Sequence, residues 1–303
     1  MRFNLSKTSI IAAIITLPLL WGSCDEPVAP TGCTDITASN YADWAVIDDE
    51  SCEYTESGAL IFVDNFEGSS LDNSKWTHDI GTGNWGWGNG ELQYYKAQNT
   101  TVSEGIAKIT AKKNDNGLNY TSSKIKTDGK FSFRYGKVQA SIKTVNGKGF
   151  WPAFWLLPSG GNWPCDGEID IMEQWAKDGN TNVTTGAAHL GECPYNESTR
   201  KYKNFERNIS SLSNETDQSF ANDFHIYEIR WEPNKIDWYV DNQHVYQITP
   251  NSFPSKYTWP FNSNDWYIIL NLAIDRNGPS AITEFPSQME IDWVRVYALE
   301  HDN

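Results

Sequence analysis

Short runs that alternate apolar and polar residues fill most of the chain beyond residue 58. Residues 137–143 (KVQASIK) and 289–297 (MEIDWVRVY) show the alternation most clearly. A period of two puts the apolar side chains on one face of an extended segment, so it predicts half-buried antiparallel strands. Similar extended runs occupy residues 106–112, 225–231, 236–240 and 267–273. A hairpin turn is predicted at residues 240–244, where the sequence is VDNQH.

Helical patterns are weak throughout the chain. No segment holds a helical hydrophobic period for more than about two turns. Glycine, asparagine and aspartate residues separate the extended runs, which is typical of proteins built from many short strands. We therefore predict an all-β fold over residues 58–303, a β-sandwich of two antiparallel sheets.

The composition is that of a folded protein, and it limits the choice of ligand. The chain has 303 residues, of which 39% are hydrophobic and 21% charged, enough for one large or two ordinary domains. Its 14 tryptophans exceed what a core requires, and tryptophan is well suited to stacking on a flat ligand face. The net charge of −15 should repel nucleic acids and anionic lipid surfaces, so we expect a neutral or cationic partner.

Residues 1–23 resemble an export signal. Arg2 and Lys7 precede an apolar run at residues 10–20. This run has the length of a signal-peptide core and is too short to span a bilayer. The sequence WGSC that follows resembles a bacterial lipoprotein signal, which implies that Cys24 becomes the lipidated first residue. No later apolar run approaches the roughly 18 residues of a transmembrane helix. We therefore expect an exported lipoprotein of the outer membrane or cell surface, attached to the membrane only by its lipid.

Residues 24–57 differ from the rest of the chain. An acidic tether follows the lipidation site and leads to a small cysteine-flanked unit at residues 33–54. This unit is too short to form a core of its own and would need a disulfide. Its acidic residues at positions 48–50 either bind calcium or form a solvated turn. We interpret residues 24–57 as a tether with this unit, and residues 58–303 as the main domain.

The cysteine count fits an exported protein. With Cys24 lipidated, four of the five cysteines remain, and an exported protein can oxidise them to disulfides. Proximity in the sequence pairs Cys33 with Cys52 and Cys165 with Cys193. Free buried thiols are the alternative.

Three carboxylates fall within six residues of one predicted strand, at Glu168, Asp170 and Glu173. In a regular strand the first two project to the same face and Glu173 projects to the opposite face. A β-bulge at residues 171–172 would absorb one residue and return Glu173 to the shared face. We predict such a bulge, because bulges often re-aim a side chain beside an active site.

Crowded carboxylates favour a particular chemistry. Like charges at close range raise the pKa of one of the groups. Two carboxyl groups whose pKa values are driven apart provide the ionised nucleophile and the protonated acid that glycoside hydrolysis requires. The alternative is a solvent-facing acidic strand paired with lysine or arginine, but the neighbouring residues are mainly apolar and aromatic.

Tryptophans surround the acidic strand in the sequence. Trp151, Trp155 and Trp163 all lie within 20 residues before it, and indole rings stack on the C–H faces of pyranose rings. Any one of them could belong to the core. Three of them near a carboxylate pair predict a polysaccharide-binding cleft.

The motif of residues 168–173 resembles the signature of glycoside hydrolase family 16, in the form that contains the bulge. Segments at residues 89–95, 151–155, 259–261, 270–273 and 289–297 resemble the laminarinase (endo-β-1,3-glucanase) branch, and the resemblance spans about residues 60–298. It implies that residues 58–303 form a catalytic domain, a β-jelly-roll sandwich with a concave sheet that bears the cleft. It also implies endo-acting hydrolysis of neutral, laminarin-like β-glucans by a monomer that needs no cofactor for catalysis.

The same resemblance implies residue roles. Glu168 matches the nucleophile, Glu173 the general acid/base and Asp170 the helper between them, in a retaining double displacement. The positions that match sugar contacts are Asn89, Arg134, Trp151, Trp155, Trp163, Gln174 and His189. His189 could instead be a hydrogen-bonded core histidine, and Arg134 an ordinary surface charge. A structural calcium ion is implied at Asn65, the Gly105 carbonyl and Asp292, although Asp292 could simply be a solvated strand carboxylate.

Other functions stay open at this point. The chain could cleave another polymer, such as mixed-linkage β-glucan or a galactan like agar, or it could be a non-catalytic glycan-binding lipoprotein. The bulged spacing differs from the unbulged spacing of the lichenase and xyloglucan branches, and inactive relatives usually lose a carboxylate that is present here. Residues 274–277 (IDRN) depart from the family, whose members commonly have a glycine-rich loop there.

Overall fold

The computed structural model describes residues 29–34, 42, 44–49, 51, 58–175, 181–212 and 219–298. The chain divides into two compact units, Met1–Thr55 and Glu56–Asn303. Within the first unit, β1 (Thr31–Gly32) and β2 (Ile47–Asp48) pair in parallel. The predicted export signal, Cys24, Glu50 and Cys52 lie outside the described residues, so the predictions made for them, including the Cys33–Cys52 pairing, stay predictions.

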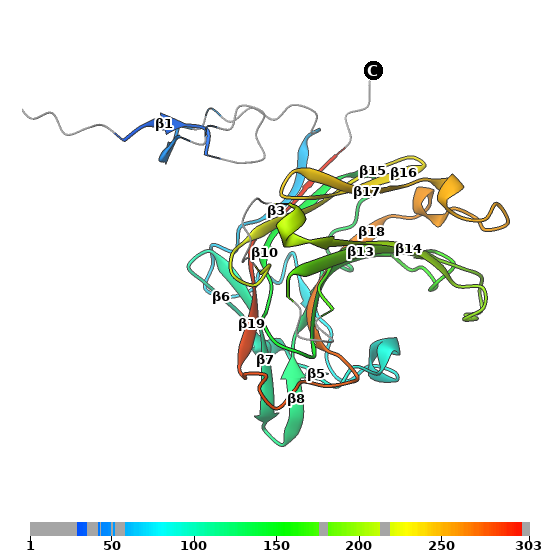
Figure 1. Cartoon of the computed structure of the whole chain (residues 1–303), viewed down its shortest axis with the longest axis horizontal. Coiled ribbons are helices and arrows are strands. Elements are labelled where there is room, and N and C mark those ends of the chain that lie inside the picture. The colour runs from blue at the N-terminus through cyan, green and yellow to red at the C-terminus, as the bar shows by residue number, and fades with distance from the viewer. Residues whose placement is uncertain are drawn as a thin grey trace, which may run out of the picture. The chain divides into compact units, whose positions relative to one another are not determined.

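The second unit contains a seven-stranded antiparallel sheet. Its order is β14 (Lys201–Asn208), β13 (Val183–Leu190), β12 (Glu168–Glu173), β11 (Phe150–Pro158), β18 (Trp266–Ile274), β9 (Lys124–Lys126) and β4 (Thr77–His78). Figure 1 shows that this sheet curves, so that its outer face is concave.

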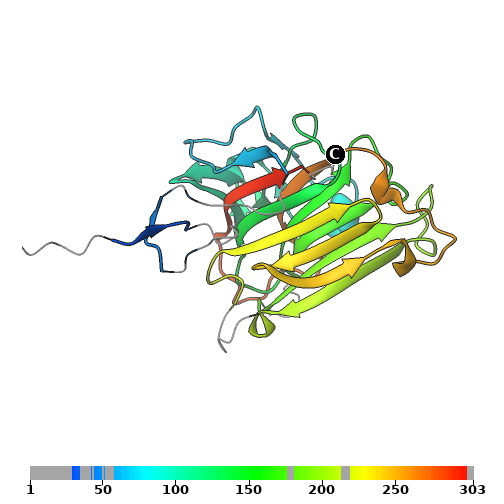
Figure 2. The same cartoon turned by 90° about the horizontal axis from the view of Figure 1, so that it is seen from above.

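A ten-stranded sheet packs against the first. Its order is β17 (Gln243–Ile248), β16 (Lys235–Val240), β15 (His225–Glu232), β10 (Gly136–Lys143), β19 (Ser287–Tyr297), β7 (Ile106–Asp115), β8 (Leu118–Ser122) and β5 (Tyr94–Tyr95), with β3 (Leu60–Asp64) beside β19 and β6 (Thr100–Ser103) beside β7. Figure 2 shows several of these long strands side by side. All pairs in this sheet are antiparallel except β5 with β8.

Helical structure in the described residues is limited to short turns. They are η1 (Gly86–Gly90), η2 (Ala97–Asn99), η3 (Ile209–Ser211), η4 (Pro250–Ser252) and η5 (Pro260–Asn262). The predicted β-jelly-roll sandwich is therefore confirmed. Each predicted extended run lies within one observed strand, and the hairpin turn at residues 241–242 joins β16 to β17.

The alternating sequences explain where the core forms. In β10, Val138, Ala140 and Ile142 are fully buried between the sheets, as a period of two requires of a strand with one face inward. The strand β18 is apolar along almost its whole length and is buried on both faces. Large indole rings fill the space between the sheets, among them Trp231 and Trp238.

The strand β12 contains the predicted β-bulge. Opposite β11, Met172 pairs with Phe154 and Asp170 pairs with the next residue, so Ile171 has no partner. Opposite β13, the register shifts between Asp170 and Glu173 in the same way. One extra residue therefore returns Glu173 to the face shared with Glu168 and Asp170.

Two residues accommodate the bulge. The indole Nε1 of Trp238, from the opposite sheet, donates a hydrogen bond of 2.9 Å to the carbonyl oxygen of Asp170. Gly186 lies beside the bulge on β13, where an added Cβ would sit 2.8 Å from that carbonyl and 3.0 Å from the carbonyl of Ile171. Because a buried carbonyl requires a partner, the opposite sheet helps to fix the conformation of β12.

We expect Trp238→Phe to lower the free energy of unfolding by about 1–3 kcal/mol, because it removes a buried hydrogen bond to the Asp170 carbonyl. Amide hydrogen exchange in β12 should become faster. Trp231→Phe is the matched control, because it removes an indole hydrogen bond of 3.0 Å to the Phe261 carbonyl without touching β12. Equal protection of β12 in both variants would contradict a role of Trp238 at the bulge.

Candidate active site

A cleft of about 350 Å³ lies on the concave face of the seven-stranded sheet. Glu168, Asp170 and Glu173 all line it, whereas Ile169 and Met172 between them point into the core. The other residues that line the cleft are Trp87, Gly88, Asn89, Glu91, Tyr95, Lys124, Trp151, Ala153, Trp155, Leu157, Trp163 and Asn271. The structure thus brings the three predicted carboxylates together with Asn89 and the three predicted tryptophans.

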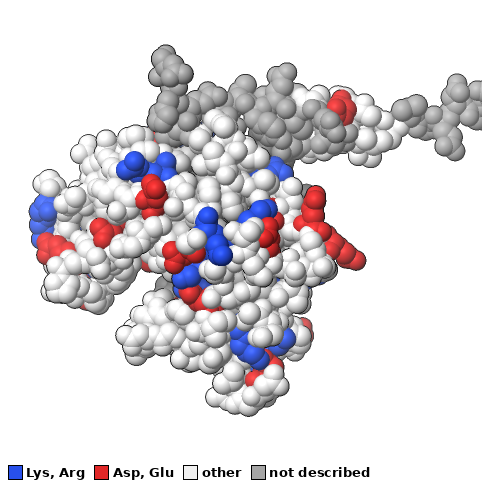
Figure 3. Space-filling view, turned by 180° about the vertical axis from the view of Figure 1, so that it is seen from behind, with Lys and Arg blue, Asp and Glu red and all other residues white. Residues whose placement is uncertain are grey.

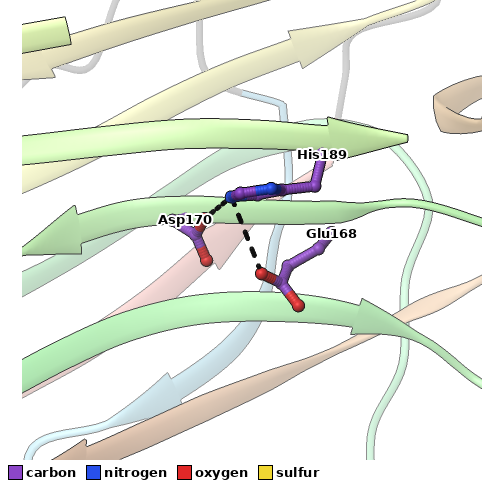
Figure 4. Close-up of side chains that lie close together, drawn as sticks. All are labelled: Glu168, Asp170 and His189. Carbon is purple, nitrogen blue, oxygen red and sulfur yellow. Dashed lines mark ion pairs between the residues drawn. The ribbon is translucent and has the colours of Figure 1, made fainter. Parts of the chain in front are cut away.

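His189 contacts the carboxylates from the neighbouring strand β13, where it pairs with Glu168. Its Nε2 lies 3.1 Å from Asp170 Oδ2 and 3.9 Å from Glu168 Oε1 (Figure 4). Its Nδ1 lies 3.5 Å from a guanidinium nitrogen of Arg200. Since arginine can only donate, Nδ1 accepts and the ring proton sits on Nε2, directed at Asp170. His189 is therefore a partner of the carboxylates rather than a residue of the cleft lining.

Glu173 is held by an aromatic pair. The indole Nε1 of Trp151 donates a 2.9 Å hydrogen bond to Glu173 Oε1. The ring of Trp175 stacks on Trp151, with centroids 4.6 Å apart and planes 6° apart. Trp175 in turn donates 2.9 Å to Asp275 Oδ2, a buried carboxylate in the segment that departs from the family pattern. This departure therefore supports one wall of the cleft.

A chain of hydrogen bonds crosses the cleft on the other side of β12. Trp155 donates a hydrogen bond of 2.7 Å to the side-chain oxygen of Asn271, and the Asn271 amide donates one of 3.2 Å to the hydroxyl of Tyr95. That hydroxyl donates 3.1 Å to Glu91, which also accepts from the side chain of Asn89 at 3.3 Å. These contacts fix polar groups and one indole in the cleft before any ligand binds.

Lys124 is a buried cation in the same half of the cleft. Its Nζ lies 3.3 Å from Asp79 Oδ2 and over the rings of Trp87 and Trp155, at 4.6 and 5.0 Å from their centroids. Burial lowers the pKa of Lys124, while the charges of Asp79 and Glu91 oppose that effect.

Sequence reasoning missed several residues of the cleft. They are Trp87, Glu91, Tyr95, Lys124 and Asn271. Glu91, Tyr95 and Asn271 lie in segments that carry the family resemblance, which is the signal that could have identified them. Lys124 sits in the unremarkable sequence SSKIKT, and only the fold brings it to the cleft.

The predicted Cys165–Cys193 disulfide is confirmed, and its two cysteines are 28 positions apart in the sequence. It joins the loop after β11 to the loop after β13. The first loop carries Trp163, which lines the cleft, and the second carries Tyr195, whose ring centroid lies 5.0 Å from that of Trp163. The disulfide thus connects two loops that bear aromatic residues at the cleft margin.

Besides His189, two further predicted sugar contacts do not line the cleft. Gln174 is fully buried and its amide donates 2.6 Å to the carbonyl of Thr181. It follows Glu173 at the end of β12, so its side chain turns away from the cleft face. Arg134 is exposed and lies over the ring of Tyr135, 5.8 Å from its centroid, and it does not line the cleft. Neither residue lines the cleft, so the structure does not bring these two predicted sugar contacts together with the others.

Burial controls the electrostatics of the carboxylates. It raises the pKa of Glu168, Asp170 and Glu173 to about 8 in each case. The charge of Asp170 raises the pKa values of the two glutamates further, while His189 lowers both. The hydrogen bond from Trp151 also lowers the pKa of Glu173. Three charges this close favour protonation of at least one carboxyl group at neutral pH.

The residues predicted to bind calcium come together on the other sheet. The strands β3 and β7 both pair with β19 near Asp292, and the Asn65 carbonyl lies 3.9 Å from the Cβ position of Gly105. Burial raises the pKa of Asp292, whose Oδ2 lies 3.4 Å from the hydroxyl of Ser141. A half-buried carboxylate and backbone oxygens are ligand types that calcium prefers.

Comparison with known proteins is consistent with this site. A sequence profile described as "Glycosyl hydrolases family 16" matches residues 84–295. A glucan endo-1,3-β-glucosidase A1 of Niallia circulans is 35% identical over 78% of this chain, which spans only 37% of that protein's length. A β-glucanase of Rhodothermus marinus is 33% identical, over 78% of this chain and 84% of the relative.

Solved structures show the same architecture. The endo-β-1,3-glucanase of Pyrococcus furiosus superposes with a TM-score of 0.71 at 38% identity, covering 81% of this chain and 96% of that one.

The raised pKa values predict how one substitution affects stability. Glu168 has a higher pKa in the folded state than its ordinary value of 4.5, so folding binds its proton more tightly. Its contribution to stability is full below about pH 4.5 and is lost as the pH rises towards 8. We expect Glu168→Gln to raise the melting temperature at pH 8, because it removes a buried charge, and to have little effect at pH 4. Each kcal/mol gained in the free energy of unfolding should raise the melting temperature by about 2–4 °C.

Thermal unfolding across this pH range would measure the effect. Glu67→Gln is the control, because Glu67 is an exposed carboxylate outside the cleft. A stabilisation by Glu168→Gln that did not grow with pH would contradict the electrostatic interpretation.

Proposed function

The chain belongs to glycosyl hydrolases family 16, and we propose that it cleaves β-1,3-glucosidic bonds inside laminarin-like β-glucans. One observation carries the proposal most directly: a bulged strand presents Glu168, Asp170 and Glu173 to one aromatic-lined cleft. The named activities of the relatives from Niallia circulans and Pyrococcus furiosus support β-1,3-glucan as the substrate.

The first step would form a covalent glycosyl-enzyme. Ionised Glu168 attacks the anomeric carbon while protonated Glu173 gives its proton to the glycosidic oxygen, so the C–O bond breaks and the leaving chain departs as an alcohol. The hydrogen bond from Trp151 occupies one oxygen of Glu173, which leaves the other oxygen to carry the proton.

The second step would release the sugar with retention. Glu173, now ionised, removes a proton from water, and the water oxygen attacks the anomeric carbon as its bond to Glu168 breaks. Asp170 acts as a positioning residue beside the nucleophile. The Nε2–H group of His189 holds Asp170 and also lies near Glu168. Its positive end lowers the pKa of Glu168, which helps to keep the nucleophile ionised.

The cleft suits an uncharged polysaccharide. Its four tryptophans can stack on pyranose rings, and Asn89, Glu91 and Asn271 can bond hydroxyl groups. Among the described residues that line it, Lys124 is the one cation, and Asp79 already pairs with it. A sulfated galactan would require more unpaired positive charge. Figure 3 shows acidic and basic side chains close together on one face of the molecule, without a broad basic patch that would suit nucleic acid.

We also propose that residues 1–23 direct export, that Cys24 carries the lipid, and that the monomer works at the outer membrane or cell surface. The signal-like sequence supports this, as does a disulfide in the catalytic domain, because disulfides persist in oxidising compartments. Within the part of the chain that the structure describes, no helix has the length and apolarity needed to cross a membrane.

The two glutamate roles make different predictions. We expect Glu168→Gln to lower kcat on laminarin by roughly 10⁴-fold or more, because no covalent intermediate can form. Glu173→Gln should also lose laminarin cleavage, but it should still release one equivalent of phenol from an aryl β-laminaribioside with an acidic leaving group, since such a group needs no proton. Burst kinetics would measure this, with Glu67→Gln as the control. A phenol burst from Glu168→Gln would sink the assignment of the nucleophile.

Substrate choice can be tested separately. We expect the wild-type chain to release oligosaccharides internally from laminarin and to leave agarose and carrageenan intact, because the cleft has few cations and is built for a neutral chain. Product analysis by chromatography on laminarin, lichenan, agarose and carrageenan would measure it. Faster cleavage of a galactan than of laminarin would contradict the proposed substrate.

We further propose a structural calcium ion at Asn65, Gly105 and Asp292. A metal chelator should then lower the melting temperature, because a ligand at 100 times its dissociation constant stabilises a fold by about 2.7 kcal/mol. Differential scanning calorimetry with and without calcium would measure the shift, and Asp292→Asn should abolish it. A wild-type melting temperature that changes with neither calcium nor chelator would contradict the calcium site.

A further inference from the structure

The concave sheet continues for two strands beyond the catalytic strand, and its register forms three rows. Antiparallel partners that lie directly opposite project to the same face. The rows run from Glu168 to His189 and Tyr202, from Asp170 to Ala187 and Asn204, and from Glu173 to Thr185 and Glu206. Each row therefore starts at a carboxylate and ends at the outer strand β14.

The neighbouring residues confirm which face these rows occupy. Ala188 and Leu190 on β13, and Phe205 on β14, belong to the core between the sheets. The alternating residues Tyr202 and Asn204 are exposed, and the Tyr202 ring stacks on His189 with centroids 5.5 Å apart. The side chains of the three rows thus lie on the face that carries the cleft.

We propose that the concave face of β13 and β14 binds the glucan on the leaving-group side of the scissile bond, with Tyr202 as its stacking platform. This acceptor surface consists of Tyr202, Asn204 and Glu206 around Ala187. The inference rests on the proposed function, because an internal cut requires polymer on both sides of the reacting carbon.

The position of the cleft determines which half binds which part of the substrate. The enclosed cavity is built mainly by β11, β18, β9 and the loop before β5, all on the opposite side of β12. Its hydrogen bonds between Trp155, Asn271 and Glu91 are already in place. In a double displacement the leaving chain must depart before water attacks. The shallow, exposed half therefore suits the leaving chain, and the enclosed half suits the sugar that stays bound to the enzyme.

Tyr202 has the exposure that a stacking platform requires. Its side chain keeps 52% of its accessible surface even though the ring stacks on His189. The guanidinium of Arg200 lies 5.4 Å from the ring centroid and is itself held by Glu197 at 2.8 Å. Tyr202 is therefore oriented by its neighbours before ligand binding, which lowers the entropy lost on stacking.

The row in the middle provides a shallow floor. Ala187 is the smallest side chain of the three rows and lies between the larger pairs formed by His189 with Tyr202 and Thr185 with Glu206. Asn204 and Glu206 are exposed beside it and can bond sugar hydroxyl groups. No lysine or arginine belongs to these rows, so this surface suits a neutral chain as the cleft does.

The loop between β13 and β14 borders the same surface. Its Tyr195 is half exposed and bonds Glu197 through its hydroxyl group. Its ring lies beside Trp163 of the cleft, and the Cys165–Cys193 disulfide joins the two loops. The margin of the cleft is thereby continuous from Trp163 to Tyr202.

Comparing two substrates isolates this surface. An aryl β-laminaribioside fills the enclosed half and has only an aryl group beyond the scissile bond, whereas laminarin extends across both halves. We expect Tyr202→Ala to lower the ratio of kcat/KM for laminarin to kcat/KM for the aryl substrate by about threefold to tenfold, the range expected for loss of one aromatic stacking contact. Tyr202→Phe should keep the ratio of the wild type, because it retains the ring.

A second readout follows the acceptor directly. Added laminaribiose should intercept the wild-type glycosyl-enzyme: its hydroxyl oxygen bonds to the anomeric carbon, the bond to Glu168 breaks, and the hydroxyl proton passes to Glu173. Tyr202→Ala should reduce this transfer product relative to hydrolysis by a similar factor. Lys203→Ala is the control, because Lys203 is exposed on the same strand but alternates with the row residues.

These outcomes distinguish a failure of the acceptor surface from a failure of the proposed function. An unchanged substrate ratio and unchanged transfer in Tyr202→Ala would overturn the acceptor surface while the proposed function stands. A larger loss on the aryl substrate than on laminarin would also overturn it, because Tyr202 would then serve the enclosed half. No cleavage of laminarin by the wild-type chain would instead contradict the proposed function itself.

Discussion

The bulge at Ile171 is the constraint on which the active site depends. A regular strand would direct Glu173 into the core on the side of Ile169 and Ile171, and the cleft would hold only two of the three carboxylates. The extra residue reverses the side-chain alternation for the rest of β12. The Asp170 carbonyl beside the bulge accepts a hydrogen bond from Trp238 of the other sheet. The catalytic geometry is therefore secured by both layers of the sandwich rather than by one strand.

The close, buried carboxyl groups that the reaction requires also reduce the stability of the fold. Burial raises the pKa of all three carboxyl groups, and a fold selected only for stability would not place them side by side. Weak contacts offset part of that cost. His189 contacts Asp170, the Trp151 indole donates to Glu173, and the charge of Lys124 lowers the pKa of Glu168. The contact between His189 and Glu168 is long, at 3.9 Å, and Glu173 accepts from a neutral indole, so these contacts hold the two glutamates only weakly.

Local pattern predicted most of the fold and the centre of the site. Alternation identified β10 and β19, and three carboxylates in six residues required a bulge if they were to share a face. Contacts that depend on distant segments could not be derived in this way. Lys124 looks like an ordinary strand lysine until β9 pairs with β18 and brings it beside Trp155. Gln174 looks like a neighbour of the acid until the strand ends and its amide binds Thr181. Arg134 has the right chemistry but lies on a loop outside the cleft.

The two halves of the concave face differ in a way that follows from the reaction order. The sugar that becomes covalently bound must stay in register through two displacements, so rigid groups such as the Trp155–Asn271–Tyr95 chain are useful on its side. The leaving chain must dissociate between those displacements, and tight binding there would slow turnover. An exposed tyrosine in the row next to a small alanine provides contact area with little enclosure. The disulfide at Cys193 limits how far that open margin can move, so the binding surface stays aligned with the catalytic strand while the chain leaves.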